Sequence, residues 1–159
     1  MPLESNSWNL TFPAEYAEIV PTTDLNMQLE ELTGDVMEIA RRAGSFLAAE
    51  RLKIGESEIE LKGKGDLVSR ADRESEAMIR EALEKLLPGS VVMAEEDSPE
   101  ATGGDWRWIV DPLDGTMNYL MGLPVWAVSI ALEDRRLAST GFGPIAAGVI
   151  IAPELEYIY

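Results

Sequence analysis

Two aspartates, Asp111 and Asp114, follow a short apolar segment and are separated by a proline and a leucine. Pro112 fixes φ and stiffens the turn, so both carboxylates are expected to converge on one point from a rigid frame. Hard oxygen ligands of this kind are what Mg²⁺ or Mn²⁺ prefers. Gly115 lets a ligand approach the backbone, and the N–H groups that follow point at an anion if a helical turn starts there. A metal and an anion in one loop indicate phosphate chemistry.

An isolated motif of this kind is equally typical of a plain polar turn, because Asp, Pro and Gly dominate turns. The flanking residues favour the functional interpretation. The stretch Asp111-Pro112-Leu113-Asp114-Gly115-Thr116, followed by Asn118-Tyr119, resembles the signature of the inositol monophosphatase family. That signature is an apolar strand, Asp-Pro-(Ile/Leu)-Asp-Gly-Thr, and then Asn-(Phe/Tyr), and every position matches.

A second acidic element, Glu95-Glu96, follows an apolar segment at 91–93. By itself an acidic pair at the end of a strand is typical of a solvated turn. The family places a Glu-Glu pair here, and Glu95 matches its metal-binding glutamate, although the preceding residue is often glycine there and is Ala94 here. Two strands of one sheet, ending at Glu95 and Asp111, would bring these carboxylates together.

The third element is residues 62–72, in which a Lys-Gly-Lys-Gly run leads to Asp66-Leu67-Val68-Ser69 and on to Asp72. It resembles the family's lysine-containing mobile loop followed by Asp-(Leu/Ile)-Val-(Thr/Ser)-x-(Ala/Thr)-Asp. Alone, Asp72 is typical of a helix cap and the glycines of a flexible linker. The resemblance implies that Asp72 hydrogen-bonds Thr116 and that the loop closes over the metals.

The family hydrolyses phosphate monoesters with Mg²⁺ and is commonly inhibited by lithium, so the resemblance implies two or three Mg²⁺ ions and inositol monophosphate as the substrate. Fructose-1,6-bisphosphatase and histidinol phosphatase activities are the alternatives within the superfamily. Glu95, Asp111 and the Leu113 carbonyl would serve the first metal, with Thr116 Oγ as a further candidate. Asp111 would bridge to a second metal that Asp114 also binds.

The resemblance also assigns the remaining roles. Glu95 and Thr116, the latter held by Asp72, would orient a water that the metal activates for in-line attack. Asp114 and the backbone N–H groups of Gly115 and Thr116 would hold the phosphate.

One departure limits this interpretation. The family's second half carries a Trp-Asp-x-(Ala/Thr)-Ala-Gly motif, whose aspartate completes the second metal site, and the 159 residues contain no such motif. We therefore expect residues 24–159 to be the N-terminal half of a domain of this family, after an irregular arm at 1–23. A non-catalytic metal-binding or interaction fragment is the alternative of a different class. The free chain is expected to self-associate or to be poorly soluble, because a sheet edge and an apolar face would be exposed.

The hydrophobic periodicity predicts the elements that position these residues. One helix begins at Asp24 and fades before Gly55, and a second follows a strand at 57–62 and a loop at 63–66. Ser69 or Asp72 is expected to cap the second helix, and Pro88-Gly89 to end it. Strands are expected at 91–93, 107–110, 125–132 and 146–151, with a return at 154–159, and residues 134–143 form a connection longer than the family's usual tight turn. The predicted fold class is α+β, with two helices packed on a largely antiparallel sheet, as in the N-terminal part of the layered αβαβα sugar phosphatase fold.

Composition excludes several classes of protein. The chain has no cysteine and no histidine, so thiolate nucleophiles, histidine triads and histidine zinc sites are excluded. Its net charge of −16 and the lack of a basic patch argue against a nucleic-acid partner. No apolar stretch is long enough for a membrane span and no secretory signal is present, so a cytoplasmic location is expected. The expected partners are a small phosphorylated substrate and, in the full-length family form, a second copy in a homodimer.

Overall fold

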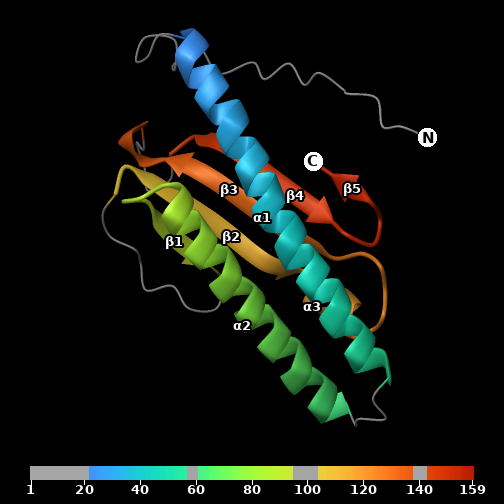
Figure 1. Cartoon of the computed structure of the whole chain (residues 1–159). Helices are drawn as coiled ribbons and strands as arrows, with labels where there is room; N and C mark the ends of the chain where they lie inside the picture. Colours follow the sequence, from blue (N-terminus) through green and yellow to red (C-terminus); the bar gives the residue numbers. More distant parts are fainter. Residues whose placement is uncertain (1–21, 57–60, 95–103, 138–142) are drawn as a thin grey trace, which may run out of the picture.

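The computed structural model describes residues 22–56, 61–94, 104–137 and 143–159 (Figure 1). Two long helices, α1 (Thr22–Glu56) and α2 (Leu61–Leu86), come first. The remaining elements are β1 (Val91–Ala94), β2 (Trp106–Asp114), α3 (Thr116–Leu120), β3 (Ala127–Asp134), the 3₁₀ turn η2 (Arg135–Leu137), β4 (Ile145–Ala152) and β5 (Tyr157–Ile158).

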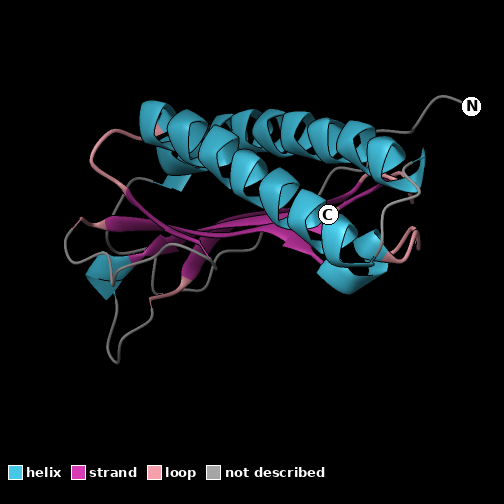
Figure 2. Cartoon of the chain, turned by 90° about the horizontal axis from the view of Figure 1, so that it is seen from below, coloured by secondary structure: helices cyan, strands magenta, loops and turns pink. Residues whose placement is uncertain are grey.

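The five strands form one sheet in the order β1-β2-β3-β4-β5. β1 pairs with β2 in parallel, and the other neighbouring strands pair antiparallel. The helices α1 and α2 run in opposite directions, and both lie on the same face of the sheet (Figures 1 and 2). The predicted fold class, two helices on a largely antiparallel sheet, is therefore confirmed.

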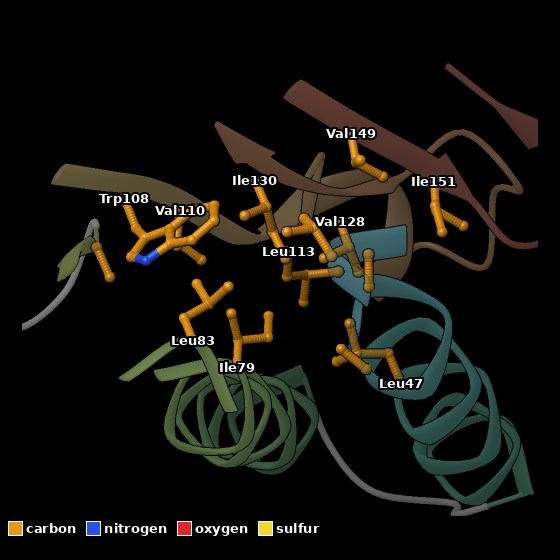
Figure 3. Close-up of a cluster of buried hydrophobic side chains, with 14 of the residues drawn as sticks. Leu47, Ile79, Leu83, Trp108, Val110, Leu113, Val128, Ile130, Val149 and Ile151 are labelled. Carbon is orange, nitrogen blue, oxygen red and sulfur yellow. The ribbon is translucent and has the colours of Figure 1, made fainter. Parts of the chain in front are cut away.

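The core lies between the helix pair and the sheet because each element carries the period that its geometry requires. On α1 the buried side chains recur at steps of three and four residues, which is the helical period; they are Val36, Ala40, Ala43 and Leu47. Alternate residues of β2 and β3 face the helices and are buried, which is the strand period; they are Trp108, Val110, Val128, Ile130 and Leu132. Ile79 and Leu83 of α2 close the same cluster (Figure 3).

The strands predicted at 91–93, 107–110, 125–132 and 146–151 all exist, with bounds displaced by a few positions, and the return after β4 is the short strand β5. The prediction for the start of the second helix was wrong. Residues 61–66 are helical. The last two positions of the strand predicted at 57–62, and the whole loop predicted at 63–66, therefore belong to the first turns of α2. Residues 57–60 lie outside the described part.

Because α2 starts earlier than predicted, Ser69 and Asp72 lie inside it and do not cap it. The buried stripe of this helix reaches back to Val68, which is 3% exposed, so tertiary packing supports the helix ahead of Asp72. The first helix also runs further than predicted, to Glu56 and hence past Gly55. The predicted end of the second helix before Pro88 is confirmed. The predicted arm at 1–23 lies almost wholly outside the described residues.

The connection between β3 and β4 is fixed by charges buried at the end of the sheet remote from Asp111. Glu133 is fully buried, accepts a hydrogen bond from Arg107 Nε at 2.5 Å and accepts another from the Gly143 N–H. Arg136 binds both carboxylate oxygens of Asp134, at 2.9 and 2.7 Å. These contacts give the ends of the long connection a structural role, which the sequence did not indicate.

Candidate active site

A β-bulge at the end of β2 sets the direction of the two aspartates. Asp111 pairs with Ser129 of β3, but Asp114, three residues later, pairs with Ala127, only two residues away on β3. Two residues of β2 therefore lie opposite one residue of β3, which defines a bulge. In a regular strand, residues three apart point to opposite faces. Since paired residues share a face and Ala127 and Ser129 are two apart, the bulge brings Asp111 and Asp114 to the same face.

The two residues of the bulge have distinct roles. Pro112 has no N–H and is disfavoured inside a regular ladder, so it favours the irregularity. Leu113 is 1% exposed and anchors the turn in the core, where Figure 3 shows its side chain beside Val128. The Leu113 N–H donates to Asp111 Oδ1 at 3.1 Å, which fixes the first carboxylate against its own turn.

Beyond the bulge, the chain turns through Gly115 into α3. Gly115 has φ of 82° and ψ of 35°, the left-handed conformation that glycine adopts readily. A Cβ at this position would lie 2.9 Å from the Val125 carbonyl oxygen, so the close approach of two backbones also requires glycine. The Tyr119 N–H donates to the Gly115 carbonyl at 3.0 Å, which confirms that a helical turn starts here. The first N–H groups of such a turn have no partner within the helix.

The turn is braced from the core by two aromatic residues. Tyr119 is 1% exposed and its hydroxyl donates to the Leu47 carbonyl of α1 at 2.7 Å. The Trp126 ring meets Tyr119 edge-on, with ring centroids 5.2 Å apart. Burial raises the pKa of the Tyr119 phenol, and the Glu50 carboxylate adds to the effect. The phenol therefore stays protonated and ties α3 to α1.

Thr116 and Asp72 lie on elements that contact each other, α3 and α2. The Thr116 hydroxyl donates to the Leu113 carbonyl at 3.0 Å. Asp72 is 9% exposed, and its charge adds to the rise in the Tyr119 pKa. The predicted hydrogen bond between Asp72 and Thr116 stays a prediction.

Glu95, the third carboxylate among the predicted metal ligands, lies outside the described residues. The strand that leads to it does pair as expected: β1 runs parallel to β2, and Ala94 is in register with Val110. Val110 directly precedes Asp111, just as Ala94 directly precedes Glu95. The expectation that the two strands belong to one sheet is therefore confirmed, and they are in fact neighbours, while the position of Glu95 stays a prediction.

The donors in the described part are all oxygen atoms. They are the carboxylates of Asp111 and Asp114, the Leu113 carbonyl, which has a second lone pair besides the one that Thr116 uses, and the Thr116 hydroxyl. Within the described ranges no three acidic side chains cluster closely enough to hold an ion. Mg²⁺ is commonly bound by one or two carboxylates and keeps several waters, so this donor set fits it.

Three features of the site were missed by the sequence analysis. The strand was predicted to end at Val110, but β2 continues to Asp114, and only Pro112 inside it signals the bulge. The Tyr119 contact with Leu47 spans 72 residues of sequence, so no local pattern indicates it. The packing of Gly115 against Val125 is likewise invisible to a local pattern.

Comparison with known proteins agrees with this geometry. The model of the family described as "Inositol monophosphatase family" matches residues 28–159. The inositol-1-monophosphatase of Mesorhizobium japonicum is 40% identical over 134 residues, which are 84% of this chain and 48% of that protein. A fructose-1,6-bisphosphatase/inositol-1-monophosphatase from Aquifex aeolicus is 38% identical over 79% of this chain and 45% of its own length.

Among solved structures, the extragenic suppressor protein suhB of Bartonella henselae matches with a TM-score of 0.61 and 40% identity, over 77% of this chain and 44% of that one. The chain thus spans about half the length of the curated relatives it matches. No helix in the described ranges is both long and apolar enough to cross a membrane. Since the family model covers most of the chain and agrees with the fold and the aspartate loop, the chain belongs to the inositol monophosphatase family.

Proposed function

We propose that this chain supplies the metal- and phosphate-binding half of a Mg²⁺-dependent phosphatase that hydrolyses a phosphate monoester, inositol monophosphate in particular. The observation that carries the proposal is the β2 bulge, which turns Asp111 and Asp114 to one face of the sheet directly before the helical turn at Gly115. Two carboxylates and a set of backbone N–H groups on one short segment suit a substrate that brings negative charge together with its metal.

In this proposal two or three Mg²⁺ ions are held by Asp111, Asp114, the Leu113 carbonyl and Glu95. When bound, Mg²⁺ lowers the pKa of water and offsets the charge of the phosphate oxygens. The rigid turn keeps the carboxylates aimed before substrate arrives, because Asp111 is fixed by the Leu113 N–H and Leu113 is anchored in the core.

The remaining groups position the reactants. Glu95 and Thr116 orient the attacking water, and Asp72 holds the Thr116 hydroxyl. In this structure the Thr116 hydroxyl donates its hydrogen bond to the Leu113 carbonyl. For the proposed role the hydroxyl must rotate so that it donates to the Asp72 carboxylate instead. The N–H groups of Gly115 and Thr116 would donate to the phosphate, and Asp114 would act on it through the Mg²⁺ that it helps to hold. Because this chain has no histidine, proton transfer by its own groups falls to carboxylates, lysines or metal-bound water.

The substrate follows from the relatives' names rather than from contacts in this half. The Mesorhizobium relative favours inositol phosphate, and the Aquifex relative's double name adds fructose-1,6-bisphosphate as a second candidate. Histidinol phosphate is the third substrate to test. The cytoplasm is the proposed location, since a chain without cysteine suits a reducing compartment.

The test is a pair of matched variants of the 159-residue chain, Asp114→Asn and Asp105→Asn. Each substitution removes one negative charge from an exposed aspartate. Asp114 is the last residue of β2, beside the bulge, whereas Asp105 directly precedes β2 at its other end. Mg²⁺ binding is measured by isothermal titration calorimetry. Phosphate release from inositol 1-phosphate, fructose 1,6-bisphosphate and histidinol phosphate is measured with and without Mg²⁺ and with added Li⁺.

We expect Asp114→Asn to weaken Mg²⁺ binding by at least about tenfold, because it removes a charged ligand, and Asp105→Asn to leave binding unchanged. Phosphate release that needs Mg²⁺, falls with Li⁺ and is lost in Asp114→Asn would mean that this half is sufficient for activity. Site-specific Mg²⁺ binding without release would favour a metal-binding fragment that needs the other half of the longer relatives. Equal Mg²⁺ binding by both variants would contradict the proposal.

A further inference from the structure

Methionine supplies all the sulfur of this chain, which has seven methionines and no cysteine. A mild oxidant therefore reacts with thioethers here, because no thiolate competes for it. Two of the methionines lie directly after Thr116: Met117 is in α3, and Met121 is the residue that caps its C-terminal end. The oxidation chemistry of α3 thus lies beside the candidate site.

Exposure separates these two residues from the other methionines whose side chains the structure describes. Met117 is 65% exposed and Met121 is 67% exposed, whereas Met78 of α2 is 38% exposed. Met37 and Met93 are exposed still less. Because oxidation of methionine follows exposure, Met117 and Met121 are expected to react first.

The two exposed thioethers are neighbours on one side of α3. The Met121 N–H donates to the Met117 carbonyl at 3.0 Å, so the side chains lie one helical turn apart, where apolar contact stabilises a helix. Side chains of a helix also lean towards its N-terminus, which directs Met117 back over the turn at Gly115 and Thr116. A change of polarity in these side chains therefore acts on that turn.

We propose that Met117 and Met121 form a reversible oxidation site whose modification loosens α3. The oxidant is hydrogen peroxide, which carries no charge and is therefore not repelled by a chain of net charge −16. The thioether sulfur attacks one peroxide oxygen, an S–O bond forms as the O–O bond breaks, and the other oxygen leaves as water with both protons. The sulfur is oxidised to a sulfoxide by two electrons, and the peroxide is reduced.

The modification is reversible because a sulfoxide reductase removes the oxygen again. In that step two thiols of the reductant become a disulfide, and the sulfoxide oxygen leaves as water.

Oxidation loosens α3 because a sulfoxide is polar and its oxygen accepts hydrogen bonds. Two adjacent sulfoxides lose the apolar contact between the thioethers, and an acceptor close to the backbone competes for the N–H groups of a helix. With five residues, α3 is far too short to be stable without such contacts. The Tyr119 hydroxyl still holds the segment to α1 from the core, so the effect is local and the fold persists.

A consequence for ligand binding rests on the proposed function. If the N–H groups of Gly115 and Thr116 donate to phosphate, a sulfoxide oxygen at Met117 competes with the phosphate for them. Oxidation then weakens phosphate binding. The oxidation site and its effect on α3 do not depend on phosphatase activity.

The first test is limited treatment of the 159-residue chain with hydrogen peroxide, followed by peptide mass spectrometry that measures the oxidation rate of each methionine. We expect Met117 and Met121 to be oxidised at least about threefold faster than Met37 and Met93, with Met78 between them, because susceptibility follows exposure. Equal rates at all five positions would overturn the proposal.

Hydrogen exchange measured by mass spectrometry tests the effect on α3. We expect the Tyr119 and Met121 amides, which form the hydrogen bonds of α3, to exchange faster after oxidation and to recover after treatment with a sulfoxide reductase. Circular dichroism verifies that the oxidised chain is folded. Unchanged exchange of these amides in the oxidised wild type would overturn the proposal.

Leucine variants identify the sulfur atoms responsible. Met117→Leu/Met121→Leu keeps the apolar bulk but has no sulfur on α3, so peroxide should leave its α3 exchange unchanged. The matched control Met78→Leu should respond to peroxide as the wild type does. A double variant that responds like the wild type would show that the effect comes from another residue and would overturn the proposal.

Calorimetric titration with inorganic phosphate in the presence of Mg²⁺ separates this proposal from the proposed function. Oxidation should weaken phosphate binding about three- to tenfold in the wild type, the effect of one hydrogen bond, and not at all in the double leucine variant. A reduced chain that binds no phosphate would contradict the proposed function, whereas the exchange of the α3 amides would still decide the oxidation site.

Discussion

Gly115 is the residue on which the shape of the aspartate loop depends most directly. Its positive φ and the Val125 carbonyl only 2.9 Å from a would-be Cβ make any side chain unfavourable in two independent ways. We predict that Gly115→Ala destabilises the fold by about 2–4 kcal/mol, as left-handed strain and a backbone clash combine. Urea unfolding followed by circular dichroism measures the change. The control is Gly34→Ala, at an exposed position of α1 where the new Cβ meets no atom within 4 Å. This substitution is expected to raise the free energy of unfolding.

Tyr119 makes the free energy of unfolding depend on pH in the alkaline range. Its pKa is raised by burial, so the folded protein keeps the phenol proton above the pH at which an unfolded tyrosine loses it, about 10. The folded state then binds one more proton than the unfolded state, and the free energy of unfolding falls by about 1.4 kcal/mol per pH unit above that point. Below it, the raised pKa contributes its full stabilisation.

The prediction is tested by comparing the wild type with Tyr119→Phe between pH 8 and 11. The variant loses the hydrogen bond to the Leu47 carbonyl, which costs about 1–3 kcal/mol at neutral pH because a buried carbonyl loses its donor. Its stability should fall less steeply at high pH, so the difference between the two proteins narrows as the pH rises. A difference that stays constant over this range would mean that Tyr119 ionises as easily in the folded state as in the unfolded state.

At the scale of elements, the sequence predicted most of what one element determines by itself. The helix that carries the buried stripe from Val36 to Leu47 and the strand that carries Trp108 and Val110 were both predicted from local patterns, and both exist. The predicted start of α2 was wrong. Gly63 and Gly65 each disfavour a helix by about 1 kcal/mol, which favoured a loop in the sequence analysis, but the helix includes both residues. Intrinsic propensity was outweighed by the rest of the fold, which a local pattern does not contain.

The candidate site shows the same division. The candidate ligands for metal and phosphate were visible in the sequence, and so was the expectation that the strands leading to Glu95 and Asp111 share one sheet. The bulge that turns Asp111 and Asp114 to one face was not visible, because it is defined by pairing with β3. Sequence thus indicated the chemistry, whereas the direction of the ligands depends on contacts between strands.

The ion pair between Arg107 and Glu133 joins β2 to β3 at the other end of the sheet. Glu133 is fully buried and the Arg107 side chain is 11% exposed, so removal of the cation leaves a buried carboxylate without its charge partner. We predict that Arg107→Met costs about 3–5 kcal/mol in unfolding free energy. The double variant Arg107→Met/Glu133→Leu should recover part of this loss, because the uncompensated charge is also removed.

The matched control is Lys85→Met, which breaks the ion pair between Lys85 and Glu81. The side chains of this pair are 73% and 71% exposed. An exposed pair contributes at most about 1 kcal/mol, so this control should change stability very little. Equal effects of Arg107→Met and Lys85→Met in urea unfolding would show that burial of the β2–β3 pair carries no special weight.

At the scale of the whole molecule, α1 and α2 cover one face of the sheet, and no helix among the described residues covers the other (Figure 2). That face carries the candidate metal ligands Asp111 and Asp114. The curated relatives are about twice as long as this chain, so they contain a further segment of similar size whose place the described residues do not define.

Net charge should make the stability of the whole chain depend on salt. A charge of −16 on one small domain repels itself in the compact state, and salt screens this repulsion. The Debye length falls from about 30 Å at 0.01 M to about 8 Å at 0.15 M ionic strength, so the melting temperature should rise over this range of NaCl concentration. Calorimetry of the wild type and of Glu31→Gln/Glu38→Gln, which removes two exposed negative charges from α1, tests the cause, because the variant should gain less from salt. A melting temperature that falls as NaCl is added would mean that ion pairs such as Arg107–Glu133 outweigh the self-repulsion.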